Sequence, residues 1–153
     1  MGKLFGTDGI RGIVNDDLTA SLAFKIGASV AKVLKQELKK DNLTFLVGTD
    51  TRISKDMFTA SIISGVLSEN CNIIDLGIMP TPAISYLTKE LKKDGAFIIS
   101  ASHNPSKYNG IKVLDQNGYK LTEQMEEKIE RQIINFEENN QINKCGKILK
   151  TKD

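Results

Sequence analysis

The stretch Gly95–Ala101, with the sequence GAFIISA, is the most apolar of three strand-like runs, and the prediction of the fold starts from it. A continuous apolar run of this length is typical of a strand that is buried on both faces. Two similar runs, Leu43–Val47 and Asn72–Leu76, precede it, and a glycine follows each of them. Strands of this kind, separated by helices, form βαβ units, which require parallel pairing and right-handed crossovers. The sequence therefore predicts a three-layer α/β/α domain with a mostly parallel, mixed sheet.

Apolar residues spaced three and four apart predict the helices between and around these strands. We expect Ser54 and Thr122 to be the N-caps of the second and last helices. Thr81 is the expected N-cap of the third, with Pro82 at its first helical position. The expected helices cover, in chain order, residues 19–39, 54–67, 81–92 and 122–136.

The dipeptide Asn117-Gly118 lies between two short strand-like runs, Ile111–Asp115 and Tyr119–Thr122. Asn-Gly in this setting is the strongest short-range signal for a hairpin. Polar residues follow the last helix, so we expect the domain to occupy residues 1–140. Residues 141–153 then form the start of a linker to a second domain outside this sequence, and residues 145–153 have the pattern of a strand that begins there.

The 153 residues carry 21 Lys and Arg against 19 Asp and Glu, a formal charge of +2. This balance argues against a nucleic-acid partner or an anionic membrane surface. Cys71 and Cys145 have neither a disulfide-framework nor a zinc-ligand spacing, and His103 is the single histidine. The sequence has no apolar run of about 20 residues and no secretory signal. We therefore expect a cytoplasmic protein that does not enter a membrane.

Three loops follow the carboxyl ends of the predicted strands, at residues 48–52, 77–82 and 100–105. In an open parallel sheet, ligands bind beyond these ends. The third loop contains Ser102–Asn104, whose hydroxyl, imidazole and amide, together with backbone N–H groups, can hold an oxyanion or a phosphate. The alternative is an ordinary turn, in which the serine and asparagine side chains only satisfy backbone groups.

Basic residues flank this candidate site. Lys112 lies ten residues after Ser102, and the intervening loop is long enough to bring its ammonium back towards the serine. A lysine there neutralises phosphoryl charge or transfers a proton; the alternative is a solvated surface lysine. Arg11 and Arg52 each follow a Gly-Thr-Asp segment, and a guanidinium suits bidentate phosphate binding. The alternative is that each arginine pairs with its nearby aspartate, such as Asp50, and fixes its own loop.

Four motifs occur in one order, and we list them with their positions: FGTDGIRG at Phe5–Gly12, GTDTRIS at Gly48–Ser54, GIMPTP at Gly77–Pro82, and SASHNP followed by YNGIK within Ser100–Lys112. Together they resemble the N-terminal domain of the α-D-phosphohexomutases over nearly the whole chain. The FGTDGIRG opening is most similar to the bacterial phosphoglucosamine mutases, which interconvert glucosamine 6-phosphate and glucosamine 1-phosphate. Tyr108 is more similar to the phosphomannomutase/phosphoglucomutase branch.

The resemblance implies a role for each residue of the candidate site. Ser102 is then the phosphoserine that transfers a phosphoryl group between the 6- and 1-positions of a hexose phosphate, through a hexose 1,6-bisphosphate. Lys112 acts as the general acid or base, and Arg11 approaches the phosphoserine. His103 and Asn104 shape the same loop. A phosphoserine oxygen at Ser102 also ligates Mg²⁺, together with aspartates of a second domain.

The resemblance also implies partners. The family has four domains, so three further domains would complete the active site, and we expect the isolated chain to fold without turning over a phosphosugar. An apolar face left open by those domains would favour self-association. The residues leave one alternative of a different class, a non-catalytic module that binds phosphate or a partner, because the sequence contains no Asp-x-Asp-x-Asp metal motif.

Overall fold

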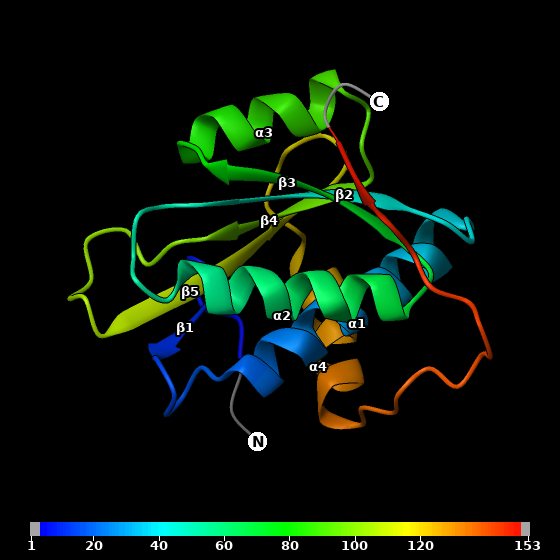
Figure 1. The fold of residues 1–153 in the computed structure, drawn as a ribbon, viewed down its shortest axis with the longest axis horizontal. Coiled ribbons are helices and arrows are strands. Elements are labelled where there is room, and N and C mark those ends of the chain that lie inside the picture. The colour runs from blue at the N-terminus through cyan, green and yellow to red at the C-terminus, as the bar shows by residue number, and fades with distance from the viewer. Residues whose placement is uncertain (1–3, 151–153) are drawn as a thin grey trace.

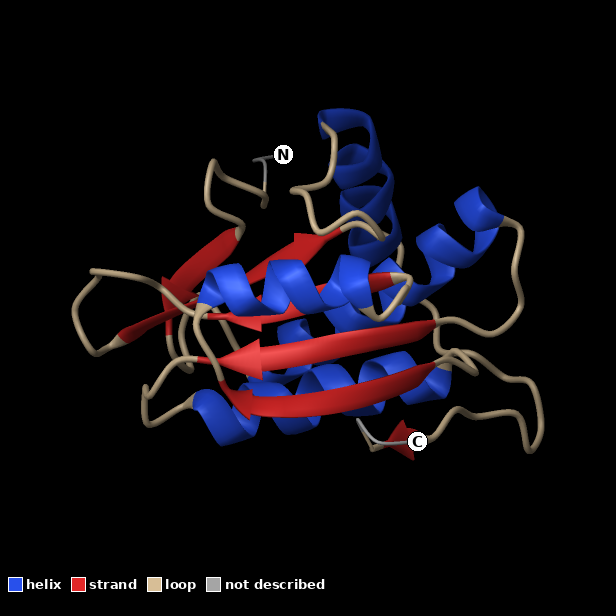
Figure 2. Ribbon diagram, turned by 90° about the horizontal axis from the view of Figure 1, so that it is seen from above, coloured by secondary structure: helices blue, strands red, loops and turns tan. Residues whose placement is uncertain are grey.

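The computed structural model describes residues 4–150, which form one six-stranded sheet with helices on both faces (Figures 1 and 2). The strands are β1 (Ile10–Ile13), β2 (Thr44–Thr49), β3 (Asn72–Ile78), β4 (Gly95–Ile99), β5 (Tyr108–Leu114) and β6 (Ile148–Leu149). Their order across the sheet is β1-β5-β4-β2-β3-β6. β2 pairs in parallel with β3 and β4, and β3 pairs in parallel with β6. β5 runs antiparallel to both of its neighbours, so the sheet is mixed and mostly parallel.

The helices are α1 (Ala20–Leu38), α2 (Lys55–Ser68), α3 (Thr81–Glu90) and α4 (Glu123–Ile134). α1, α2 and α4 lie together on one face of the sheet, and α3 lies on the other (Figure 1). The three predicted layers are therefore confirmed. Thr19 and Thr122 cap α1 and α4, because their hydroxyls accept the N–H groups of Leu22 and Met125 at 3.1 and 3.2 Å. Among residues 4–150, no helix is both long enough and apolar enough to cross a membrane.

The sheet separates two apolar cores of unequal size. The larger lies beneath α1, α2 and α4 and contains the buried rings of Phe45, Phe58 and Phe97. The smaller lies under α3, around Leu46 and Ile84. β4 lies between β5 and β2 and is buried at every position. Because β4 meets both cores, its sequence is continuously apolar, which is the pattern that predicted it.

The start of α3 differs from the prediction by one residue. Its N-cap is Pro80 and not Thr81, so Pro82 is the second helical residue. The reason is that the Pro80 carbonyl already accepts the N–H groups of Ala83 and Ile84, at 3.0 and 3.2 Å. The extended ψ of Pro80, 143°, is that of a residue just outside a helix.

The Asn-Gly turn is present, but its second arm is not a strand. Gly118 has a φ of +80°, and its N–H donates to Asp115 O at 3.0 Å. A single bridge between Leu114 and Lys120 follows, and the chain then enters the cap of α4 at Thr122. The first arm, β5, instead pairs with β4 and β1 and so joins the main sheet.

Two short strands at the sheet edges depend on distant partners. β1 was not predicted, because its four residues, IRGI, are too few to show a clear alternation of apolar and polar side chains. The strand is stabilised by its pairing with β5. β6 lies after the predicted domain boundary at residue 140, yet Ile73 N–H donates to Lys147 O at 3.0 Å and the strand extends the sheet. The boundary itself stays a prediction.

α1 and α2 approach each other closely at Gly65. A Cβ on Gly65 would overlap the Phe24 carbonyl oxygen and lie 2.8 Å from Ala28 N. We therefore expect Gly65→Ala to lower the free energy of unfolding by about 1–3 kcal/mol, as overpacking does. Urea unfolding followed by circular dichroism measures this change. The matched control is Ser64→Ala on the exposed side of α2, which should stay within about 0.5 kcal/mol of the parent; an equal effect of both substitutions would contradict the prediction.

Candidate functional site

The carboxyl ends of β2, β3 and β4 meet at one edge of the sheet, at the left of Figure 1. Backbone hydrogen bonds connect the loops that leave this edge. Asp50 N–H donates to Ile99 O at 3.1 Å, and Met79 N–H donates to Thr49 O at 3.0 Å. The three loops of the predicted ligand edge are therefore adjacent, as the topology requires.

Ser102 lies in the loop after β4 and is exposed at this edge. Its φ of +52° places it in the left-handed region, which costs a residue with a Cβ about 1–3 kcal/mol. Two hydrogen bonds of 3.0 Å make the turn: Ser102 N–H donates to Ser100 Oγ, and Asn104 N–H donates to Ala101 O. Such a conformation persists only where neighbouring groups fix it, so these contacts hold the serine at the sheet edge.

Arg11, on β1, reaches this loop from the side. Its Nη1 donates to Asn104 Oδ1 at 3.0 Å, its Nη2 donates to Ser102 Oγ at 3.4 Å, and Nη2 also lies 3.8 Å from Asp8 Oδ2. Gly110 is paired with Arg11 across the strands, and a Cβ there would lie 2.9 Å from Arg11 Cγ. Arg11 Nε is buried and has no hydrogen-bond partner among the described residues. Because Nη1 and Nη2 each donate only one hydrogen bond among the described residues, the guanidinium keeps terminal donors for a ligand next to the serine.

Arg52, in the loop after β2, lies against the same segment and is only 12% exposed. Each of its terminal nitrogens donates two hydrogen bonds of 2.8–3.0 Å, and the acceptors are the backbone carbonyl oxygens of Ser102, Asn104, Pro105 and Tyr108. The predicted pair with Asp50 is also present, since Nε lies 3.4 Å from Asp50 Oδ2 and the Arg52 N–H donates to Oδ1 at 3.1 Å. The sequence carried no signal for the carbonyl contacts, because they join segments about fifty residues apart.

Lys112 lies in a neighbouring cavity. On β5 it is paired with Ile98, which is buried under α3, so Lys112 projects from the same face. It lines a cavity of about 270 Å³ together with residues of α3 and the loop around Asp8. Among the described residues, no hydrogen bond or ion pair joins its Nζ to Ser102. The structure thus brings Arg11 to Ser102 directly but not Lys112, which shares a cavity with Asp8, the residue that pairs with Arg11.

Two polar side chains next to this loop have opposite surroundings. Asn109 is fully buried: its Nδ2 donates to Ser54 Oγ, and its Oδ1 accepts Gly110 N–H, both at 2.8 Å. Ser54 stands at the predicted N-cap of α2 but makes no capping bond there. His103 is exposed, and its ring forms no hydrogen bond within residues 4–150. Asn109 supports the loop through these two hydrogen bonds. The sequence did not predict this role, because the dipeptide Asn-Gly is the same in a buried strand and in an exposed turn.

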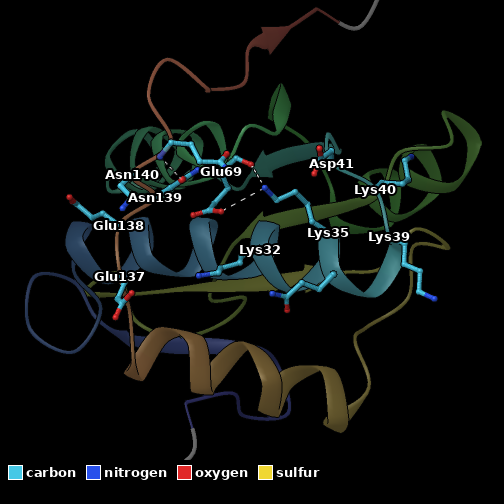
Figure 3. Close-up of a pocket in the computed structure, with 12 residues that line it drawn as sticks. Lys32, Lys35, Lys39, Lys40, Asp41, Glu69, Glu137, Glu138, Asn139 and Asn140 are labelled. Atoms are coloured by element: carbon cyan, nitrogen blue, oxygen red, sulfur yellow. Dashed lines mark hydrogen bonds and ion pairs between the residues drawn. The ribbon is translucent and has the colours of Figure 1, made fainter.

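A larger cavity, of about 760 Å³, lies between α1 and residues 137–141 (Figure 3). Equal numbers of lysines and acidic residues line it. Burial raises the pKa of Glu69 there, and the charges of Lys35 and Lys32 oppose the rise. Lys35 Nζ donates to Glu69 O at 2.6 Å and lies 3.8 Å from Glu69 Oε1. The charges that line this cavity are balanced, and the cavity shares no residue with the Ser102 edge. The Ser102 edge is therefore the better candidate site.

Residues 4–150 contain no group of three or more His, Cys, Asp or Glu side chains placed to hold a metal ion. Mg²⁺ prefers six oxygen ligands in octahedral geometry, and no cluster of acidic side chains in this range supplies them. The described residues therefore do not by themselves form a complete Mg²⁺ site.

Comparisons with known proteins agree with this geometry. The family model for phosphoglucomutase/phosphomannomutase, alpha/beta/alpha domain I, matches residues 2–140. The phosphoglucosamine mutases of Alkaliphilus metalliredigens and Clostridium novyi are 53% and 52% identical to this chain over 138 and 135 residues. These matches cover 90% and 88% of the chain, but 30% of each relative. The chain therefore spans about a third of the length of the curated relatives it matches.

Solved structures share the fold. A phosphoglucomutase/phosphomannomutase family protein from Burkholderia thailandensis matches 97% of this chain and 32% of its own, with a TM-score of 0.78 and 21% identity. The phosphoglucomutase parafusin from Paramecium matches 98% of this chain and 33% of its own, with a TM-score of 0.74 and 23% identity. Since the family model covers most of the chain and all of the motifs around Ser102, the chain belongs to the phosphoglucomutase/phosphomannomutase family, of which it is an alpha/beta/alpha domain I.

Proposed function

We propose that this chain is the phosphoserine-bearing domain of a phosphosugar mutase, with Ser102 as the phosphoryl carrier. The observation that carries the proposal is the exposed Ser102 hydroxyl at the carboxyl edge of the sheet, 3.4 Å from Arg11 Nη2. A hydroxyl there is accessible to a phosphosugar, and an adjacent guanidinium offsets the charge of a transferring phosphoryl group. Membership of the family supports the same role.

The reaction has two opposite transfers at one oxygen. Phosphorylated Ser102 gives its phosphoryl group to a hydroxyl of a hexose monophosphate, so the bond from phosphorus to the serine oxygen breaks and a bond to the sugar oxygen forms. The sugar hydroxyl loses a proton, and the serine oxygen gains one. The resulting hexose 1,6-bisphosphate then reorients in the site. It returns its other phosphoryl group to Ser102. Arg11 stabilises the phosphoryl charge in both directions.

The other predicted residues take supporting roles in this proposal. Lys112 acts as general acid or base on the sugar hydroxyl, which fits a lysine that lines a cavity and makes no bond to Ser102 among the described residues. Asn104 orients Arg11 through its 3.0 Å hydrogen bond. His103 is exposed on the same loop and shapes it.

Glucosamine phosphate is the proposed substrate, because the named relatives are phosphoglucosamine mutases. The alternative is the phosphomannomutase/phosphoglucomutase specificity. A chimaeric enzyme, in which this chain replaces the matching part of the Alkaliphilus relative, allows glucosamine, mannose and glucose phosphates to be compared side by side.

The proposal also includes the surroundings of the domain. Residues 1–140 form the domain, and residues 141–153 lead to a further domain. Mg²⁺ would be held by phosphorylated Ser102 together with aspartates of that further domain. The whole enzyme is cytoplasmic, and the isolated chain is inactive. Ile53, which is 97% exposed, and Ile78, which is 59% exposed, both lie at the site edge and favour self-association of the isolated chain.

The test is to locate the phosphate. The chimaera is incubated with glucosamine 1,6-bisphosphate, and intact-protein mass spectrometry with peptide mapping finds the modified residue. We expect one phosphoryl group at Ser102. Phosphate at another residue contradicts the proposal, and binding of phosphosugar without phosphoryl uptake favours the non-catalytic module.

A further inference from the structure

The terminal nitrogens of Arg52 have no donor left for a ligand, because both hydrogens on each of them are bonded to loop carbonyls. Nε is buried, makes no hydrogen bond among the described residues and lies 3.4 Å from Asp50 Oδ2, so a ligand does not reach it. A guanidinium that is largely removed from water requires partners of this kind. In contrast to Arg11, Arg52 therefore acts on the site only through the loop that carries Ser102.

The bonds to Arg52 fix how the peptide groups of this loop are turned. The carbonyls of Ser102 and Pro105 point towards the guanidinium, and no described peptide bond is cis. Because a trans peptide directs its C=O and N–H in opposite directions, the N–H groups of His103 and Ser106 point away from Arg52. Neither N–H donates a hydrogen bond within the part of the chain that the structure describes. Both N–H groups are therefore available on the outer side of the loop, where an anion can accept hydrogen bonds from them.

The same bonds hold Ser102 in its left-handed conformation. Ser102 N–H is held by Ser100 Oγ at 3.0 Å, and Ser102 O is held by Arg52 Nη2 at 2.9 Å. Without the second contact, the serine can relax to a more favourable φ, which moves Oγ away from Arg11. A lysine cannot replace this contact set, because one ammonium lacks the planar four-donor fork.

We infer that Arg52 is the positioning residue of the Ser102 loop: its buried guanidinium orders four carbonyls and keeps the serine oxygen within reach of Arg11. The catalytic part of this inference rests on the proposed function of Ser102. The structural part does not, and the two are tested separately.

The first experiment is hydrogen–deuterium exchange on this 153-residue chain. In Arg52→Lys, we expect amides in residues 101–109 to exchange at least about tenfold faster than in the parent, with exchange in α1 and β4 unchanged. Arg131→Lys, on the exposed surface of α4, is the matched control and should leave the loop unaltered. Asp50→Asn serves as a second variant should Arg52→Lys not fold, and a smaller acceleration confined to the same loop is expected. Unaltered loop exchange in a folded variant overturns the inference.

The second experiment measures turnover in the chimaera. We expect Arg52→Lys to lower kcat about 100-fold with KM within about threefold, because misplacing a reacting group affects the transfer step more than binding. Free guanidinium ion at millimolar concentration should partly restore Arg52→Ala and leave Arg131→Ala unaffected. Normal kcat in Arg52→Lys overturns the inference. A parent chimaera that takes up no phosphate at Ser102 would refute the proposed function alone, since the exchange result still tests the role of Arg52 in the loop.

Discussion

Ser102→Ala is expected to abolish phosphoryl uptake and to reduce mutase turnover in the chimaera by at least about 10⁴-fold, as loss of a nucleophile does. The hydroxyl is the only group that the substitution removes, and it makes one contact beyond its own loop, with Arg11 Nη2. The backbone bonds of the loop remain, since they use the Ser102 N–H and C=O. Coupled assays of sugar-phosphate conversion and mass spectrometry measure the two effects.

The matched control for this variant is Ser106→Ala, which removes an exposed hydroxyl from the same loop. Its turnover should stay within about twofold of the parent, because a surface substitution away from a contact has little effect. Thermal melting should give the same midpoint for both variants. Substantial turnover by folded Ser102→Ala would mean that another residue carries the phosphoryl group.

Arg11→Ala is expected to lower kcat/KM by about 10³-fold, the range seen when an arginine that stabilises a transferring phosphoryl group is lost. Arg11 contacts both Ser102 Oγ and Asn104 Oδ1, so its loss removes positive charge and loosens the loop. The effect should fall mainly on kcat, because the charge at the phosphorus is stabilised during transfer. Steady-state kinetics separates the two parameters.

Arg131→Ala, on α4, tests whether this loss is specific to the site. It removes the same charge from an exposed position and should leave kcat/KM unchanged. Arg11→Lys is expected to recover part of the activity, because an ammonium keeps the charge but not the planar fork. If Arg11→Ala changed KM and left kcat unaltered, Arg11 would bind substrate without assisting transfer.

Much of the fold was predictable because its signals are local. The apolar run of β4 and the periodicity of α1 each reflect burial of one continuous segment. The position of Ser102 at the sheet edge follows from the strand that precedes it. The cap at Thr122 was correct for the same reason, since its hydroxyl bonds the amide three residues later. The cap at Thr81 was wrong because the preceding Pro80 already provides the first helical carbonyl.

The amino-acid sequence by itself determined the three parallel strands β2, β3 and β4, the four helices along the chain, the shared edge of the three loops and the serine exposed there, because burial patterns and chain direction are properties of contiguous segments. The resemblance already assigned Arg11 to the phosphoserine, but only the tertiary structure showed that Arg52 holds the loop through its carbonyl oxygens. Arg11 and Arg52 follow the same Gly-Thr-Asp triplet, yet one comes from a strand at the sheet margin and the other from beneath the loop. Partners separated in the chain by fifty to ninety residues are set by packing of the whole domain, which no local pattern encodes.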